Sequence, residues 1–403
     1  MQREYDIVLF GATGFTGELT AAYLAAHLPP GARLALAGRS LEKLTAVRAR
    51  LADATPAAAQ LPLISADASD PESLARLAAS TRVAVSTVGP YLRHGEPLVA
   101  ACAAAGTDYL DLTGEPEFVD TMYLRHHAAA RESGARLVHS CGFDSIPYDL
   151  GVLHAIGEVP EAARVPLRIS GYGLMSGSIS GGTYHSLVEA LGRLKESGRV
   201  SRQRRAVERH APDGAIAPGR RVRGGAGRLH REPLAGGWVM PAPTIDPQHV
   251  LRSARLNPAY GPDFSYSHYV VTGSLRSTAT LLVGLGLLTT LAQLEPTRRR
   301  LLALRRQGSG PSAQRRERSF FRVRFVTEVG GDSPRRLLSE VSGGDPGYGE
   351  TSKMLAEAAL CMAFDELTVG GGQWTPALAM GTALIGRLTR AGISFRVLED
   401  QAP

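Results

Sequence analysis

Short apolar runs recur along the first 150 residues and alternate with stretches rich in Ala and Leu. The first run is β-branched and aromatic, which is typical of a buried strand. Six strands are expected, at Tyr5–Phe10, Arg33–Ala37, Leu61–Ser65, Val83–Gly89, Asp108–Gly114 and Arg136–Gly142. Strands that alternate with helices in this way favour an α/β fold, a doubly wound parallel sheet with helices on both faces.

The pattern changes from about Leu167. Glycine-rich turns and polar loops now separate strand-like runs such as Phe320–Val329, which suggests a mixed or antiparallel sheet. Helical spacing returns at Glu350–Phe364 and Pro376–Thr389.

A chain of 403 residues is longer than one core usually supports, so two domains are expected. Residues 1–150 would form the parallel-sheet domain, and residues 151–345 a second, α+β domain for substrate. The helices within about 346–403 are expected to pack back onto the first domain.

One segment, Ala279–Leu294, is apolar apart from threonines and Gln293. It is shorter than the roughly 20 residues that span a bilayer, so a buried helix is expected. The alternative is an element that faces lipid or a membrane surface, which the arginines from Arg298 onward would support.

The net charge of +7 is unevenly distributed. Arg193–Arg231 holds twelve Lys and Arg against three acids, and a second basic cluster occupies Arg298–Arg318. Such clusters can bind nucleic acid or anionic membrane. Neither contains an aromatic residue, which argues against base stacking, so we expect no nucleic acid partner and interpret them as solvated faces.

The three cysteines, Cys102, Cys141 and Cys361, fit no disulfide framework or metal-ligand spacing. We therefore expect no metal and a reducing compartment. The first strand begins by Tyr5 without an apolar signal region, so the expected location is the cytoplasm.

Three glycines, Gly11, Gly14 and Gly17, lie between the first strand and a predicted helix. Glycine lets the backbone approach a pyrophosphate, and the amides at a helix N-terminus bind it. The turn is completed by Thr13, Phe15 and Thr16. This arrangement predicts a Rossmann-type dinucleotide site.

The second strand ends in Gly38, Arg39 and Ser40, where NAD-binding domains usually carry an acid. A guanidinium suits a 2′-phosphate because it forms bidentate, charge-assisted hydrogen bonds. The predicted cofactor is therefore NADP(H).

Further cofactor contacts are expected where later strands end. Asp67 would lie near the adenine, and the segment Ser86–Tyr91 would pass the nicotinamide ribose. The residues expected to contact the cofactor here are Asp67, Thr87, Val88, Gly89, Tyr91 and Cys141. Because Cys141 has no obvious paired base, we interpret it as a small packing residue and not a nucleophile.

Several motifs together resemble the saccharopine dehydrogenase-like oxidoreductases. They are GATGFTG, AGRS, STVGPY, YLDLTGE and CGFDSIPYDLG. Within that group the likeness is greatest to the trans-acting enoyl reductases of actinobacteria. It continues through Leu256–Val270 and Gly310–Phe325 to the C-terminal GGGQWTPALAMGTALIGRL, whereas Arg199–Gly236 matches poorly.

The resemblance implies NADPH-dependent reduction of a C=C bond in a polyketide or lipid-like chain, supplied in trans to a synthase. The alternatives are a C=N reductase of the saccharopine type and a non-catalytic, lipid-associated NADP-binding protein. A carrier-bound acyl substrate, contact with a polyketide synthase or a membrane, and a homodimer are all compatible with the sequence.

Enoyl reduction needs a donor that stabilises an enolate oxygen and delivers a proton. The candidates are Tyr91, Asp144, Tyr184 and His185. Each has an alternative role: Tyr91 as a lid on the nicotinamide ring, Asp144 or Ser145 as a helix cap, and Tyr184 and His185 as packing residues.

Overall fold

The computed structural model describes residues 3–176, 181–210, 219–304 and 312–401. Seven parallel strands form the first sheet, in the order β14-β6-β5-β4-β1-β2-β3. Their bounds are β1 (Tyr5–Phe10), β2 (Leu34–Gly38), β3 (Leu63–Ser65), β4 (Thr81–Ser86), β5 (Asp108–Asp111), β6 (Arg136–Val138) and β14 (Gly372–Trp374). All six predicted strands are confirmed, in the 3-2-1-4-5-6 order of a doubly wound fold.

Helices cover both faces of this sheet, as predicted. Ile7 and Leu9 of β1 pack into the core shared with α1 (Phe15–His27), α2 (Leu41–Ala54) and α14 (Gly349–Phe364). Val8 and Phe10, which alternate with them, face the opposite core. That second core is covered by α3 (Pro71–Ser80), α5 (Glu96–Ala105) and α6 (Pro116–Ser133).

Two elements from the end of the chain belong to the first sheet and its helices. Helix α14 packs against α1 and against β4 and β5. Strand β14 pairs with β6, with Trp374 opposite Val138. The final strand, β15 (Ser394–Gln401), instead pairs with β13 (Arg335–Gly343) in the second sheet. The domain limits given above stay a prediction.

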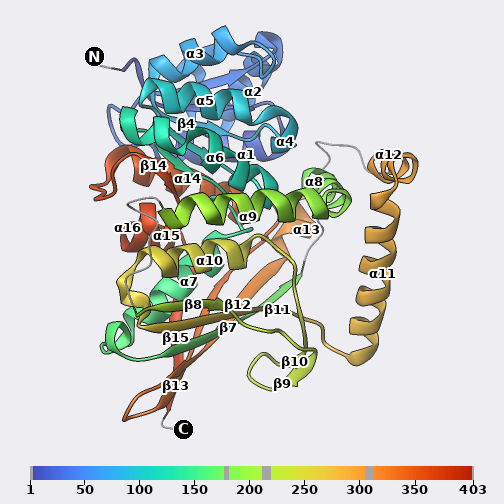
Figure 1. Cartoon of the computed structure of the whole chain (residues 1–403). Coiled ribbons are helices and arrows are strands. Elements are labelled where there is room, and N and C mark those ends of the chain that lie inside the picture. The colour runs from blue at the N-terminus through green and yellow to red at the C-terminus, as the bar shows by residue number, and fades with distance from the viewer. Residues whose placement is uncertain (1–2, 177–180, 211–218, 305–311, 402–403) are drawn as a thin grey trace.

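The second sheet is mixed, in the order β15-β13-β12-β7-β11-β10-β9, with β8 beside β11. Its remaining strands are β7 (Leu167–Ser176), β8 (Arg221–Gly224), β9 (His230–Glu232), β10 (Gly237–Pro241), β11 (Asp263–Val271) and β12 (Phe320–Val329). Strand β12 has the predicted bounds. Figure 1 shows this sheet below the first, with α9 (Leu194–His210) and α10 (Asp246–Leu256) between them.

Helix α7 (Ile146–Gly157) packs closely on the second sheet. A β-carbon on Gly151 would lie 2.4 Å from the Phe325 ring, so only glycine permits this approach. Since α7 follows the last strand of the first domain's β-α alternation, it carries the chain from one sheet to the other. The short helices α15 (Pro376–Ala379) and α16 (Gly381–Arg390) pack against it.

Helix α11 (Leu275–Gln293) contradicts the expectation of a buried helix. Among its residues only Thr278 and Ala292 are buried, whereas Val283 is 71% exposed and Leu287 59% exposed. Figure 1 shows it along one side of the molecule, where its first turns lie near β10 of the second sheet. Apolar composition alone could not distinguish a core helix from an apolar helix with few partners.

The part of α11 that does pack meets α8 (Gly181–Gly192) and α12 (Glu295–Ala303). Leu285 and Leu288 contact a small core formed by Val188, Leu191 and Ala292. Within the described residues, α11 is the helix whose length and apolar composition would allow a membrane span.

The basic segment after Arg193 is not entirely a solvated face, which corrects the interpretation made from sequence. Arg204 of α9 is 3% exposed and forms ion pairs with Asp120 of α6 (2.7 Å) and with Glu208 (3.2 Å). Arg252 of α10 binds the same Glu208 carboxylate at 2.9 Å. Both guanidinium groups lie over the Tyr123 ring, 5.0 and 4.9 Å from its centroid. This network joins α6, α9 and α10.

Candidate active site

The glycine loop after β1 is held by close contacts that only glycine allows at two positions. Gly11 has a φ of +93°, and a β-carbon there would lie 2.7 Å from the Thr87 hydroxyl oxygen. A β-carbon on Gly17 would lie 2.1 Å from the Gly11 carbonyl oxygen. At Gly14, by contrast, it would meet only that oxygen, at 3.4 Å. A β-carbon at Gly14 would therefore fit, and apart from its chain neighbours that one carbonyl oxygen would be its only close contact among the described residues.

The start of α1 fits a bound pyrophosphate. Within the described part of the chain, the main-chain N–H groups of Thr13, Phe15, Thr16 and Gly17 have no hydrogen-bond acceptor. Thr13 and Gly14 are exposed. Unpaired amides at the positive end of a helix attract phosphate. The loop residues present therefore suit the pyrophosphate of NADP(H).

The Phe15 side chain packs against later parts of the chain. Its ring meets Tyr348 edge-on, with the ring centroids 4.7 Å apart. The Arg316 guanidinium lies 5.4 Å from the Phe15 ring centroid. The Phe15 ring thus packs the loop against later parts of the chain. The Phe15 N–H is the group that we expect to contact the cofactor.

The end of β2 presents Arg39 to solvent, beside Asp67. Two hydrogen bonds from Ser69 are the main cause that lowers the pKa of Asp67, and the Arg39 charge adds to that effect. Ser40 caps α2 by accepting the Lys43 N–H at 3.2 Å, so its hydroxyl has a structural use. Gly38 is buried, and a β-carbon there would meet only Leu44, at 3.6 Å.

Thr87 and Val88 brace the glycine loop from β4. The Thr87 hydroxyl donates toward the carbonyl oxygens of Gly11 (3.1 Å) and Phe10 (3.3 Å). The Val88 side chain lies over Gly11. Gly89 follows, joined to Pro90 by a cis peptide bond. These residues border the predicted cofactor position, with the Thr87 hydroxyl engaged by the protein.

Tyr91 begins α4 (Tyr91–His94) and is 6% exposed. Its hydroxyl donates to the Ser86 carbonyl at 3.0 Å and accepts the Leu112 N–H at 3.2 Å. Burial raises its pKa well above the ordinary value. A hydroxyl held by two backbone partners has little freedom to protonate a substrate, and the donor role of Tyr91 stays a prediction.

Cys141 is 0% exposed, within the core of the first domain. Its N–H donates to the Asp111 carbonyl at 2.7 Å, and burial raises the pKa of its thiol. This placement suits a small packing residue, and a direct contact of Cys141 with the cofactor stays a prediction. All three cysteines are free and buried.

Asp144 and Tyr148 lie together where the chain passes from β6 into α7. The half-buried Asp144 carboxyl is next to Gly114, where a β-carbon would lie 3.0 Å from Oδ2. Burial raises the pKa of Asp144 to about 6. The Tyr148 hydroxyl faces β7, where a β-carbon on Gly173 would lie 2.3 Å away. Within the described residues it has no hydrogen-bond partner, and the Asp144 and Asp246 charges act on it.

The expected helix cap at this turn is not formed. Ser145 occupies the N-cap position of α7, but its side chain makes no capping hydrogen bond. Its buried hydroxyl oxygen has no partner among the described residues. Asp144 is therefore not held as a cap either, and its carboxyl remains available for chemistry.

A polar group on the second sheet, which sequence reasoning missed, completes this region. The Tyr148 ring packs edge-on against His268 of β11, with the ring centroids 4.7 Å apart. His268 Nδ1 lies 3.2 Å from the Tyr266 hydroxyl, and Nε2 lies 3.1 Å from the Thr244 hydroxyl. Burial lowers the pKa of His268 to about 3, so the ring is neutral. The signal was the alternation in β11, which puts residues 266 and 268 on one face.

Tyr184 and His185 lie elsewhere, on α8. The Tyr184 hydroxyl donates to the Leu301 carbonyl of α12 at 3.1 Å. The ring centroids of Tyr184 and His185 are 6.1 Å apart. The first contact gives Tyr184 a packing role between helices. The catalytic role of either residue stays a prediction.

The chain was compared with known proteins. Residues 7–138 match the model of the saccharopine dehydrogenase NADP binding domain. A Mycobacterium tuberculosis protein, provisionally named a trans-acting enoyl reductase, is 41% identical over 98% of this chain and 97% of its own length. A trans-acting enoyl reductase of Mycobacterium ulcerans is 38% identical, covering 97% of both chains.

The chain belongs to the trans-acting enoyl reductase family. It is an NADP-dependent oxidoreductase, and the predictions of the family and of NADP(H) are confirmed. Apo saccharopine dehydrogenase (L-Glu forming) from Saccharomyces cerevisiae shares the fold, with a TM-score of 0.55 at 12% identity over 98% of this chain and all of that chain. Within the described residues, no group of three His, Cys, Asp or Glu side chains is placed to hold a metal ion.

Proposed function

We propose that this family member reduces the C=C bond of a 2-enoyl thioester on a polyketide or lipid-like chain, with Asp144 and Tyr148 as its proton donors. The observation that carries the assignment is their placement. A carboxyl with a pKa near 6 lies beside Gly114 at the carboxyl edge of the parallel sheet. Four residues later, a hydroxyl without a partner among the described residues lies on the side of β7 in the second sheet, close enough for the Asp144 charge to act on it. Ligands of doubly wound folds bind at that edge.

NADPH supplies the hydride for such a reduction. The residues at Gly11–Gly17 would hold its pyrophosphate and Arg39 its 2′-phosphate. The Tyr148 hydroxyl is then free to donate a hydrogen bond to the carbonyl oxygen that becomes an enolate. Asp144, protonated for a substantial part of the time near pH 6, would deliver the proton to the α-carbon.

The local charges favour C=C reduction over reduction of an imine between two amino acids. Substrate carboxylates would need arginines close to the reacting atoms. Burial is the main cause that raises the pKa of Tyr148, and the charges of Asp246 and Asp144 add to it. Burial alone shifts the pKa values of Asp144 and His268. None of these three shifts has an arginine among its causes. An apolar acyl thioester is compatible with such surroundings.

We further propose a cytoplasmic enzyme that touches lipid through α11. The exposed Val283 and Leu287 lie on an apolar helix with Arg276 in its first turn and Arg299 on the helix that follows, and such cations beside an apolar surface favour anionic headgroups. This surface would bring the enzyme to membrane-associated acyl chains. Contact with a polyketide synthase is the other partner compatible with the family.

The deciding experiment follows NADPH oxidation by absorbance, with a long-chain 2-enoyl thioester in one cuvette and a keto acid plus an amine in the other. We expect turnover of the thioester alone, with a product heavier by two hydrogens. Turnover of the keto acid and amine alone would move the protein to imine reduction. No turnover of either substrate, together with tight NADPH binding, would favour the non-catalytic alternative.

A further inference from the structure

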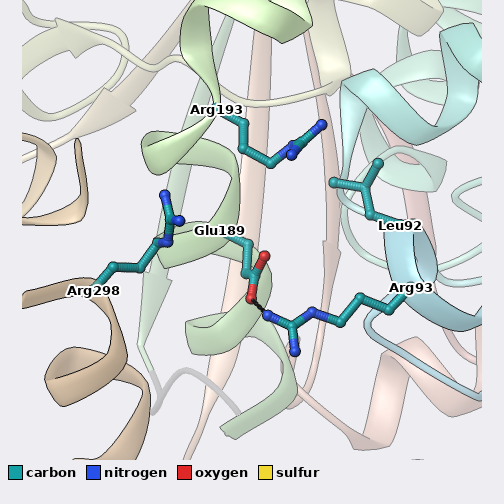
Figure 2. Close-up of a pocket in the computed structure, with 5 residues that line it drawn as sticks. All are labelled: Leu92, Arg93, Glu189, Arg193 and Arg298. Atoms are coloured by element: carbon teal, nitrogen blue, oxygen red, sulfur yellow. Dashed lines mark hydrogen bonds and ion pairs between the residues drawn. The ribbon is translucent and has the colours of Figure 1, made fainter. Parts of the chain in front are cut away.

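A pocket of about 270 Å³ lies between the first domain and helices α8 and α12. Figure 2 shows its lining, which consists of Leu92, Arg93, Glu189, Arg193 and Arg298. These residues come from three separated parts of the chain.

Three arginines and one glutamate line this pocket, and Figure 2 shows the interaction of Arg93 with Glu189. Arg93 is paired with Glu189. Arg193 is paired with Glu117 of α6, with Nε 2.9 Å from Oε2. Arg298 donates to the Ala292 carbonyl at 3.3 Å and has no carboxylate partner in the described part of the chain. With Glu117 included, the cluster still carries an excess of one positive charge, which favours an anionic ligand.

The position of Arg298 depends on close packing. A β-carbon on Gly192 would lie 2.7 Å from its Nη1 atom, so the glycine leaves the room that the guanidinium occupies. Its neighbours Arg299 and Arg300 on α12 are exposed. Arg298 is therefore held toward the pocket, while the adjacent arginines face solvent.

The location indicates which anion belongs here. Leu92 and Arg93 follow Tyr91, just beyond the segment expected to pass the nicotinamide ribose. The cofactor's own phosphates are assigned elsewhere, to the glycine loop and Arg39, so the ligand of this pocket belongs to the substrate. Acyl thioesters are presented on a pantetheine arm that ends in a phosphate.

We propose that the pocket binds the phosphate group of that pantetheine arm, an assignment that rests on the proposed enoyl reductase function. The phosphate could come from a carrier protein or from coenzyme A, and both share this chemistry. Arg298 supplies the unpaired charge, and Arg93 and Arg193 add hydrogen-bond donors.

The test compares two substrates that differ only in the phosphate: the same 2-enoyl chain as a thioester of 4′-phosphopantetheine and of pantetheine. Arg298→Gln should raise KM for the first about tenfold and leave KM for the second unchanged, with kcat unaffected. Arg300→Gln, on the same helix, is the matched control. Arg193 is unsuitable because its loss would leave the buried Glu117 unpaired.

The outcomes separate the pocket from the function. Equal effects of Arg298→Gln on both thioesters, or no effect on either, would overturn the pocket assignment while turnover upholds the reductase. If neither thioester is reduced, calorimetric titration of 4′-phosphopantetheine decides: binding lost in Arg298→Gln keeps the pocket and refutes the function, and no binding refutes both. Comparing carrier-bound with coenzyme A-bound substrate in the same two proteins then identifies the source of the phosphate.

Discussion

Gly17 and Gly11 approach so closely that a β-carbon on Gly17 would lie 2.1 Å from the Gly11 carbonyl oxygen. Gly14, three residues away in the same loop, has room for a β-carbon and a φ of −78° that any residue can adopt. Gly17 is thus required for the close packing of the loop, whereas Gly14 leaves space for the cofactor.

This difference predicts opposite outcomes for two alanine variants. Gly17→Ala should lower the free energy of unfolding by about 1–3 kcal/mol, because the backbone must move. Gly14→Ala should keep its melting temperature and lose NADPH affinity at least tenfold. Thermal unfolding and fluorescence titration measure the two effects. A Gly14→Ala protein with unchanged NADPH affinity would contradict the pyrophosphate assignment.

The position of Arg39 leads us to predict that this residue determines the preference for NADPH over NADH. Arg39→Asp should weaken NADPH binding by roughly 10- to 100-fold, since it removes a charge-assisted contact to the 2′-phosphate and adds repulsion. NADH binding should change little. Lys43→Gln, an exposed charge loss on α2, is the control. Equal weakening of both cofactors would refute the role of Arg39.

Asp144 predicts a pH dependence. Its pKa is raised from 3.8 to about 6, so the protonated, donating form is lost as pH rises through about 6, and kcat/KM should fall there. The folded state also holds this proton more tightly than the unfolded chain. The free energy of unfolding should therefore decrease as pH rises from 4 to 6.

Asp144→Asn should remove both of these pH effects and lower kcat by about 100-fold, and Tyr148→Phe should lower kcat while keeping the pH profile. Ser145→Ala, next to Asp144, removes a buried hydroxyl without a partner and should keep both activity and profile. Steady-state kinetics across a range of pH measure kcat and the pH profile of each variant. An Asp144→Asn enzyme with the wild-type profile would exclude Asp144 as the donor.

Helix α11 predicts lipid association. Val283→Asp combined with Leu287→Asp should abolish co-flotation with phosphatidylglycerol vesicles and leave the melting temperature unchanged, because both side chains are exposed. Leu398→Asp, an exposed position on β15, should behave like wild type. Wild-type protein that stays unbound to the vesicles would exclude the lipid role and favour a protein partner for this face.

The sequence predicted what depends on local patterns. Strands β1 and β12 have the expected bounds, and Gly11–Gly17 could be placed from the strand before them and the helix after them. Features that depend on distant residues could not be predicted. Asp120 and Arg204 are 84 positions apart, and no periodicity links them. The same holds for Tyr148 and His268, which meet because α7 packs across the second sheet.

The Tyr123 ring, whose centroid lies within 5.0 Å of the Arg204 and Arg252 guanidinium groups, belongs to a network that also limits how far α6, α9 and α10 can separate. Separating α6 from α9 and α10 would leave buried charges unpaired, at a cost of about 3–5 kcal/mol for each broken pair. The ion pairs of Arg93 with Glu189 of α8 and of Arg193 with Glu117 of α6 are half-exposed and are held far more weakly. The network around Tyr123 therefore keeps α6, α9 and α10 together, whereas the more exposed ion pairs beside the pocket can exchange partners with an incoming anion.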